Sequence, residues 1–138
     1  MQKNKTAVYR KVRFNAAHRL HNASLSDEEN RLLYGKCNNV NFHGHNYELV
    51  VKVLGYTNEK TGYVIDMKVL RDLLEKHIVE RFDHKNLNLD VVEFKHLNPT
   101  TENVAQVCYH LIRPELNSEL ELKIFLYETE RNFVEYPA

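Results

Sequence analysis

Two histidines in the segment Gly35–Tyr47 have the residue type and spacing needed to bind a metal ion. His43 and His45 stand two positions apart, at the start of an alternating apolar stretch. In a β-strand, side chains alternate between the two faces, so both imidazoles would project from one face and could reach one ion. The sequence therefore predicts that His43 and His45 share a metal ion.

His18 is the third predicted ligand. It ends the segment Val8–His18, whose apolar residues recur at every second position except Arg10, as in a half-buried strand. If this strand pairs as an antiparallel hairpin with the second alternating segment, His43–Leu54, then His18 lies beside the other two histidines. Three histidines with an open fourth position are the ligand set of catalytic zinc, so we expect Zn²⁺ here. The alternative is that the His-x-His pattern is incidental to a strand.

Cys37 lies six positions before His43 and has Asn38, Asn39 and Asn41 as neighbours that offer local hydrogen bonds. A thiol near a divalent cation tends to ionise, and a thiolate can accept a proton. We therefore expect Cys37 to be a base that faces the metal. Two alternatives remain: a fourth zinc ligand, which would indicate a structural metal, and an inert buried thiol.

Two carboxylates lie where they would need a partner. Asp83 adjoins His84 in a polar loop, where it could keep the imidazole basic within a proton relay, although such pairs are common at helix ends. Glu128 ends the apolar face of the segment Leu120–Thr129, and burial of an unpaired carboxylate is unfavourable. It could accept two hydrogen bonds from an amino-pyrimidinone ring, much as carboxylates accept from cytosine. The alternative for Glu128 is a salt bridge with Arg131 or another basic residue.

Hydrophobic spacing predicts the helices that surround these residues. A capping box that begins at Ser26 predicts a short helix between the first two strands. Apolar residues at helical spacing predict a second helix from Asp66 to Phe82 and a third that begins after Pro99. Pro114 is expected to end this third helix. The two longer helices would each bury one apolar face.

Two more strands, over 120–129 and 133–136, complete the order β-β-α-α-β-β of the longer elements. We expect one domain over residues 1–138, of the α+β class. Its core would be a four-stranded antiparallel sheet with two helices on one face. Open edges of such a sheet need a cover, and self-association is one way to provide it.

Composition excludes several classes of protein. Hydrophobic residues make up 43% and charged residues 28%, as in ordinary globular chains, and the formal net charge is +0. Balanced charge offers no electrostatic basis for a nucleic-acid or membrane partner. The basic N-terminus leads into an alternating segment rather than a signal-peptide core, and no apolar run could span a membrane. With two cysteines, we expect a cytoplasmic protein with reduced thiols.

Together, these motifs resemble the 6-pyruvoyl-tetrahydropterin synthase family and its bacterial relatives, the 6-carboxy-tetrahydropterin synthases. The resemblance covers nearly the whole chain. The segments that carry it are Phe14–Leu20, Leu25–Asn30, Gly35–Tyr47, Asp83–Leu87, Thr100–Asn103 and Tyr127–Asn132. It implies the tunnelling fold, in which trimers close their sheets into a barrel and two trimers stack into a homohexamer.

The resemblance also implies a role for each candidate residue. The zinc ligands would be the three histidines already named. Cys37 would be the general base, with Asp83 and His84 as its proton-relay partners, and Glu128 would anchor a pterin ring. The further residues implied near the same pocket are Thr100, Thr101 and Glu102. In this family the active site lies between subunits, so these residues need not meet within one chain.

The implied substrate is 7,8-dihydroneopterin triphosphate. The pyruvoyl-type enzyme is a lyase of tetrahydrobiopterin biosynthesis that eliminates triphosphate and leaves a diketo side chain. The carboxy type releases acetaldehyde and triphosphate on the route to queuosine. The six-residue step from Cys37 to His43 resembles the pyruvoyl type, whereas Ile65–Met67 and Asn98–Thr100 resemble the carboxy type. Phe42 departs from the glycine typical of the pyruvoyl type and could narrow the pocket.

We expect the pyruvoyl-type activity, with three alternatives. The first is the carboxy-type reaction. The second is a pterin- or purine-binding module without catalysis, in which zinc only holds the hairpin together. The third is a zinc hydrolase, in which Glu102 or Glu128 would serve a metal-bound water.

Overall fold

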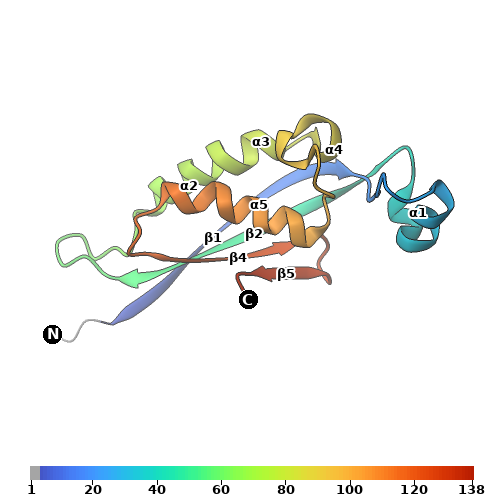
Figure 1. The fold of residues 1–138 in the computed structure, drawn as a ribbon. Helices are drawn as coiled ribbons and strands as arrows, with labels where there is room; N and C mark the ends of the chain where they lie inside the picture. Colours follow the sequence, from blue (N-terminus) through green and yellow to red (C-terminus); the bar gives the residue numbers. More distant parts are fainter. Residues whose placement is uncertain (1–3) are drawn as a thin grey trace.

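A long, twisted hairpin forms the centre of the computed structural model, which describes residues 4–138 (Figure 1). Its strands are β1 (Lys5–His18) and β2 (His43–Tyr56), which pair in antiparallel fashion over their whole length. The register sets Lys5 opposite Tyr56 and His18 opposite His43. The predicted hairpin is therefore confirmed. Residues 1–3, part of the basic N-terminus discussed above, lie outside the described range.

The sheet has five strands in the order β3-β1-β2-β4-β5, which corrects the predicted number of four. β4 (Glu121–Tyr127) and β5 (Phe133–Tyr136) are the two predicted C-terminal strands, and both pair antiparallel. The additional strand is β3 (Lys85–Asn86), which runs parallel to β1. Two residues are too few to show an alternating pattern, so the sequence predicts a polar loop here.

The first long helix is a continuous helical run of three segments. They are α2 (Met67–Leu74), the π-helical η2 (Glu75–Val79) and α3 (Glu80–Phe82). The Asp66 carboxylate accepts a hydrogen bond from the Lys68 backbone N–H at 2.9 Å, which caps the run at the predicted position.

The second long helix is α5 (Thr101–Ile112), followed by the short 3₁₀ turn η4 (Arg113–Glu115). The Thr100 hydroxyl accepts a hydrogen bond from the Asn103 N–H at 3.2 Å and so caps α5. Both long helices cover the same face of the sheet, as predicted (Figure 1). Between them they enclose buried apolar side chains from every long element: Val12, Phe14, Tyr47, Leu49, Val51, Leu70, Leu74, Ile78, Phe82, Val104, Cys108, Ile112, Ile124 and Leu126.

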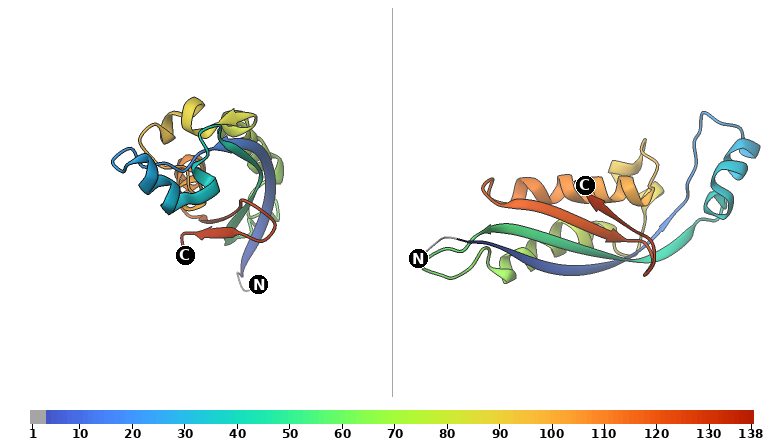
Figure 2. Two further views of the ribbon diagram at one scale, coloured as in Figure 1. Left: turned by 90° about the vertical axis from the view of Figure 1, so that its right-hand side faces the viewer. Right: turned by 90° about the horizontal axis from the view of Figure 1, so that it is seen from below.

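The connections carry the remaining short elements. Between β1 and β2 lie α1 (Asp27–Tyr34) and the 3₁₀ segment η1 (Gly35–Asn38), which extend beyond the end of the sheet (Figure 2). The predicted capping box is present, since Ser26 and Glu29 bond each other's backbone N–H groups. Before α5 lie two short turns that showed no period in the sequence, α4 (Leu87–Asp90) and η3 (Val92–Phe94).

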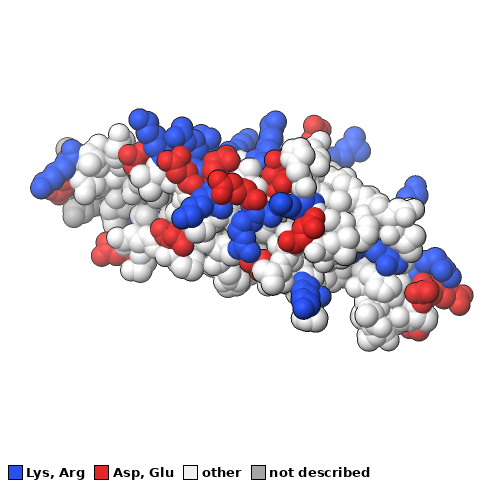
Figure 3. Space-filling model, turned by 90° about the horizontal axis from the view of Figure 1, so that it is seen from above, with Lys and Arg blue, Asp and Glu red and all other residues white. Residues whose placement is uncertain are grey.

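The surface charge follows the balanced composition. On the face in Figure 3, which looks onto the helices, Lys and Arg side chains interleave with Asp and Glu. Among the described helices, none is both long enough and apolar enough to traverse a lipid bilayer.

Candidate active site

The three predicted histidine ligands gather at the α1 end of the hairpin. The ring centroids of His18 and His43 lie 4.5 Å apart, those of His18 and His45 5.1 Å, and those of His43 and His45 5.0 Å. One potential ligand atom from each residue lies within 4.8 Å of the other two. Strand phasing and hairpin register therefore bring the three rings onto one face, as the sequence predicted. Their binding of zinc stays a prediction.

The donor atoms in this group fit a metal ion. Among residues 4–138, three buried ring nitrogens have no hydrogen-bond partner: His18 Nε2, His43 Nδ1 and His45 Nε2. Buried polar atoms are seldom left unpaired, so three from three adjacent rings indicate a ligand. Burial lowers the pKa of His18 and of His43 below the ordinary value of 6.5, which favours the neutral imidazole that metals bind.

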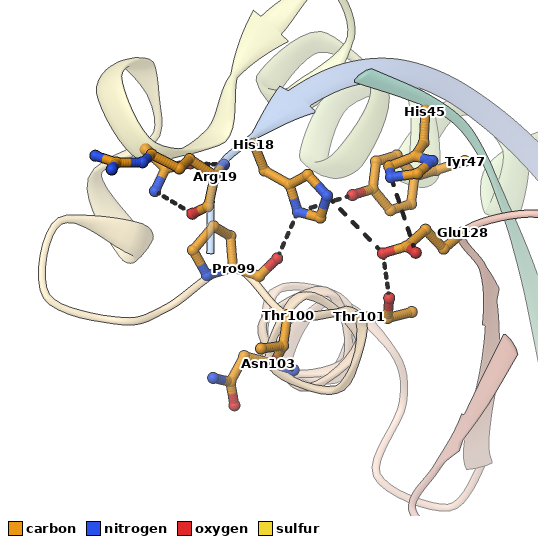
Figure 4. Close-up of polar contacts among 10 residues, drawn as sticks. His18, Arg19, His45, Tyr47, Pro99, Thr100, Thr101, Asn103 and Glu128 are labelled. Atoms are coloured by element: carbon orange, nitrogen blue, oxygen red, sulfur yellow. Dashed lines mark hydrogen bonds and ion pairs between the residues drawn. The ribbon is translucent and has the colours of Figure 1, made fainter. Parts of the chain in front are cut away.

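A backbone carbonyl sets the orientation of His18. The oxygen of Pro99 lies 2.8 Å from His18 Nδ1, so Nδ1 carries the proton and donates it (Figure 4). The lone pair of Nε2 then faces the other two histidines. A ligating histidine held in this way through its second nitrogen is common at metal sites. The hydroxyl of Tyr47 also lies 3.3 Å from Nδ1.

Glu128 lies beside the histidine group. Its carboxylate oxygens are 3.9 Å from His18 Nε2 and 3.8 Å from His45 Nε2. The hydroxyl of Thr101 donates to Glu128 Oε2 at 2.6 Å. Within residues 4–138, Glu128 forms no ion pair with Arg131, whose backbone N–H bonds Thr129 instead. The alternative of a salt bridge with Arg131 is therefore not the arrangement in the structure.

Cys37 lies in η1, on the connection that returns toward β2. Its carbonyl oxygen accepts a hydrogen bond from the Leu20 N–H at 2.8 Å, which ties η1 to the chain that leaves β1. The group of described residues that could hold a metal consists of histidines alone, which argues against Cys37 as a fourth ligand. The thiol is half-buried, whereas Cys108 is fully buried and has its pKa raised by burial. The role of Cys37 as a base stays a prediction.

The predicted Asp83–His84 pair is formed. His84 Nδ1 lies 2.8 Å from Asp83 Oδ2, and the Asn15 N–H donates to Asp83 Oδ1 at 2.8 Å. The hydrogen bond from Asn15, followed by the one from His84, holds the pKa of Asp83 below its ordinary value of 3.8. His84 is largely exposed. Within the described chain, neither residue forms a polar contact with Cys37.

A groove of about 750 Å³ joins Asp83 to the histidine group. It runs along the end of the sheet, and Asp83, His45 and Glu128 all line it. The other lining residues are Arg13, Phe14, Asn15, Gly44, Asn46, Glu48, Tyr127, Thr129 and Glu130. A planar ring in this groove could therefore reach Glu128.

The residues predicted at the start of α5 differ in what they contact. Thr101 holds Glu128, as described. Thr100 caps the helix, and its carbonyl accepts the Val104 N–H. Its place beside the substrate stays a prediction. Glu102 is exposed and makes no polar contact within residues 4–138. Glu128, rather than Glu102, is the carboxylate beside the candidate metal site.

Phe42 does not line the groove beside Glu128. It lines a second cavity, on the side of α4 and η3. Its φ angle is 67°, in the left-handed region where glycine is favoured, so a glycine at this position would relieve strain.

Two contributors to the site were not predicted. Pro99 acts through its backbone carbonyl, which no side-chain pattern signals, and Tyr47 was placed only on the apolar face of β2.

The fold and the site together define the class of protein. A hairpin, two helices and a second antiparallel pair, with a histidine group at one end, form an α+β protein of the tunnelling fold. The sequence model of one family, described as 6-pyruvoyl tetrahydropterin synthase, matches residues 7–138. The chain belongs to this family.

Similar proteins agree with this assignment. The chain is 44% identical to human 6-pyruvoyl tetrahydrobiopterin synthase over 129 residues, which cover 94% of this chain and 89% of the human protein. It is 28% identical to the 6-carboxy-5,6,7,8-tetrahydropterin synthase of Rickettsia conorii, over 91% of this chain and 96% of that protein. The solved structure of Caenorhabditis elegans 6-pyruvoyl tetrahydropterin synthase superposes with a TM-score of 0.91, at 37% identity, and covers 99% of this chain and 98% of that one.

Proposed function

We propose that this protein is a zinc-dependent lyase that converts 7,8-dihydroneopterin triphosphate to 6-pyruvoyl-tetrahydropterin with loss of triphosphate. The observation that carries the proposal is the group of three buried ring nitrogens beside the Glu128 carboxylate, which have no hydrogen-bond partner among residues 4–138. A metal ion held by these nitrogens could bind the hydroxyls of a substrate side chain. The adjacent carboxylate could bind an amino group on the ring of the same substrate. Membership of the family supports this reaction.

Glu128 would hold the pterin ring. Its carboxylate can accept two hydrogen bonds from the ring amino group and the adjacent N–H. The Thr101 hydroxyl fixes the orientation of the carboxylate before the ring arrives. Preorganised hydrogen bonds of this kind place the substrate side chain without further rearrangement.

The three histidines would hold the zinc ion. When bound, zinc supplies Lewis-acid chemistry that makes the side-chain hydroxyls and the adjacent C–H more acidic. The Pro99 carbonyl keeps the proton of His18 on Nδ1, so that Nε2 stays available to the ion. Burial keeps His18 and His43 neutral at physiological pH.

Cys37 would act as the base. Its thiolate would accept a proton from a side-chain carbon, and the C–O bond to triphosphate would break with its electron pair on the leaving group. Asp83 and His84 would relay protons at this site. Because the dyad and Cys37 do not touch within the described chain, we infer that the site is completed by a neighbouring copy in a homohexamer built from two trimers. The exposed sheet edges support such an assembly.

The carboxy-type reaction is a second candidate. It is favoured by the match to the Rickettsia conorii protein and by the motif Asn98–Thr100. The higher identity to proteins named 6-pyruvoyl tetrahydrobiopterin synthase places it second. For either reaction we propose a cytoplasmic enzyme without a nucleic-acid or membrane partner, in keeping with the balanced charge and the free cysteines.

The test is to incubate the zinc-loaded protein with 7,8-dihydroneopterin triphosphate and to identify the products by mass spectrometry. We expect a pyruvoyl-tetrahydropterin and triphosphate in equal amounts. Acetaldehyde together with a carboxy-pterin would replace the first candidate by the second. Unchanged substrate would reject both reactions, and hydrolysis of simple esters in its place would favour a zinc hydrolase.

A Cys37→Ala variant separates catalysis from a binding module with structural zinc. As a base, Cys37 is needed for turnover but not for the metal, so the variant should lose activity and keep its zinc. Zinc content is measured by atomic emission on the dialysed protein. Loss of zinc from the variant would instead make the thiol a ligand.

A further inference from the structure

A second cavity, of about 610 Å³, has an unusual set of charges. We call it the cationic cavity. Its charged and titratable lining residues are Arg19, His21, Lys95 and His96, and no Asp or Glu lines it, although the chain as a whole has equal numbers of acidic and basic residues. The remaining lining residues are Asn22, Ala23, Ser24, Tyr34, Phe42, Asn88, Phe94, Leu97 and Asn98. None of the roles described so far uses this concentration of positive charge.

Hydrogen bonds hold Arg19 in place and leave part of its guanidinium available to a ligand. Both backbone groups of Arg19 bond the Asn88 side chain, at 2.8 Å from the N–H and 2.9 Å to the carbonyl. Its Nε donates to the Asn38 carbonyl at 3.0 Å. The two terminal NH₂ groups form no hydrogen bond within residues 4–138. An arginine fixed in this way presents a preorganised fork to an anion.

His21 also has a free donor. The Asn38 amide nitrogen lies 3.0 Å from His21 Nδ1 and 2.7 Å from the Leu20 carbonyl, so it donates to both. Because Nδ1 accepts this bond, neutral His21 carries its proton on Nε2, which is available as a donor. The backbone N–H of His21 is held by Asn98 Oδ1 at 3.2 Å.

Lys95 and His96, which also line the cavity, complete the set. They follow η3 directly, and both are exposed. Their side chains form no hydrogen bond or ion pair with any residue in the range 4–138. Unpaired cations around a cavity with no acidic residue concentrate anions there.

Lining residues of the cationic cavity are next to the histidine group in the chain. Arg19 follows His18 in the chain, and Asn98 precedes Pro99, whose carbonyl holds the His18 ring. In Figure 4, Arg19 and Glu128 lie on opposite sides of His18. The order across the site is therefore a carboxylate, then the candidate metal ligands, and then the cations.

We propose that the cationic cavity is a polyphosphate subsite that holds the triphosphate chain of the substrate. This inference rests on the proposed function. It assigns a place to the triphosphate of the substrate, for which the proposed function named no residues. The substrate has the matching order: a ring with an amino group, a hydroxylated side chain and a terminal triphosphate. Arg19 and Lys95 would bind phosphate oxygens, and the His21 Nε2–H would add a donor.

The experiment measures binding of inorganic triphosphate to the full-length, zinc-loaded protein by isothermal titration calorimetry, with magnesium present so that the anion does not strip the metal. We expect Arg19→Gln to weaken binding about tenfold and Lys95→Gln about threefold, because charge-assisted hydrogen bonds are lost. The Lys95 side chain is exposed and has no partner among residues 4–138, so its replacement leaves folding intact. Lys60→Gln, in the turn after β2, is the matched control and should bind as the wild type.

Neopterin lacks the phosphates, so it distinguishes the loss of a phosphate contact from general structural damage by the substitution. Its affinity should be the same in the wild type and in Lys95→Gln, while the KM for dihydroneopterin triphosphate rises in the variant. Unchanged affinity for triphosphate in both Arg19→Gln and Lys95→Gln would overturn the proposal. An equal loss for neopterin and for triphosphate would also overturn it.

The outcomes also separate this subsite from the proposed reaction. If the wild type binds inorganic triphosphate with the expected losses in the variants but leaves the pterin triphosphate unchanged, the subsite stands and the lyase assignment fails. If the wild type turns over the pterin triphosphate and the variants keep its KM and the triphosphate affinity, the lyase stands and the subsite is rejected.

Discussion

The hydroxyl of Thr101 donates to Glu128 Oε2 at 2.6 Å, and this contact joins the first residue of α5 to the turn after β4. The other carboxylate oxygen, Oε1, lies 3.8 Å from His45 Nε2. One oxygen is therefore tied to a helix while the other faces the candidate metal ligands. The turn itself is closed by the bond from the Glu128 N–H to the Asn132 carbonyl at 3.1 Å. The pose of the carboxylate is set before any ring binds.

We expect Thr101→Val to weaken pterin binding. The change keeps the shape of the side chain but removes the donor, so the carboxylate loses the hydrogen bond that orients it. A hydrogen bond to a charged group is worth ~1.5–3 kcal/mol, so the affinity for neopterin should fall about tenfold or more. Fluorescence titration with neopterin measures this. Thr101→Ser retains the hydroxyl and is the control; equal affinity in Thr101→Val would mean that the contact does not set the carboxylate.

We expect His18→Gln to lose zinc. His18 supplies one of three unpartnered nitrogens, and the Pro99 carbonyl fixes which nitrogen that is. With a ligand removed, zinc affinity should drop by more than the roughly 10–100-fold that changes to supporting hydrogen bonds cause. Competition with a zinc-binding dye gives the affinity. His110→Gln, an exposed histidine on α5, should keep wild-type affinity. Full retention of zinc by His18→Gln would exclude this residue as a ligand.

The metal-free protein should lose stability in mild acid. Burial is the main cause that lowers the pKa of His18 and of His43 from the ordinary value of 6.5. The unfolded chain then binds more protons than the folded chain, so the free energy of unfolding falls as pH decreases through 6.5 toward the folded-state pKa values. Urea unfolding at a series of pH values measures the slope. The free energy of unfolding should depend less steeply on pH in His18→Gln than in the wild type. An identical slope would show that His18 does not contribute to the pH dependence.

Strand phasing was enough to predict the histidine group, because the period of two in β-strands is rigid. Once Val8–His18 and His43–Leu54 were read as paired strands, the side chains of all three histidines had to share a face, and the register now seen sets His18 opposite His43. Glu128 was found by a similar argument, as a carboxylate at the end of an apolar face. The sequence pattern was sufficient for these residues because the position of each one follows from the strand that contains or precedes it.

Other parts of the site depend on contacts that no local pattern encodes. The pairing of Lys85–Asn86 with β1 involves two residues and leaves no periodic signal. The Pro99 carbonyl is a backbone group, so the side chain says nothing of its role. The cationic cavity joins the chain after β1 to the chain after η3, and only the tertiary fold brings Arg19 near Lys95.

The separation of Cys37 from the Asp83–His84 dyad leads to a prediction about the assembly. If each active site combines Cys37 of one copy with His84 of a neighbour, then Cys37→Ala and His84→Gln should each be inactive alone but partly active after they are unfolded together and refolded as a mixture. In an equal mixture each site combines an intact Cys37 with an intact His84 in about one quarter of cases, so about 25% of wild-type activity should return, measured as pterin product formed. His84 is largely exposed, so its replacement leaves the fold intact. Each variant refolded alone is the control, and a mixture no more active than these controls would place the complete site within one chain.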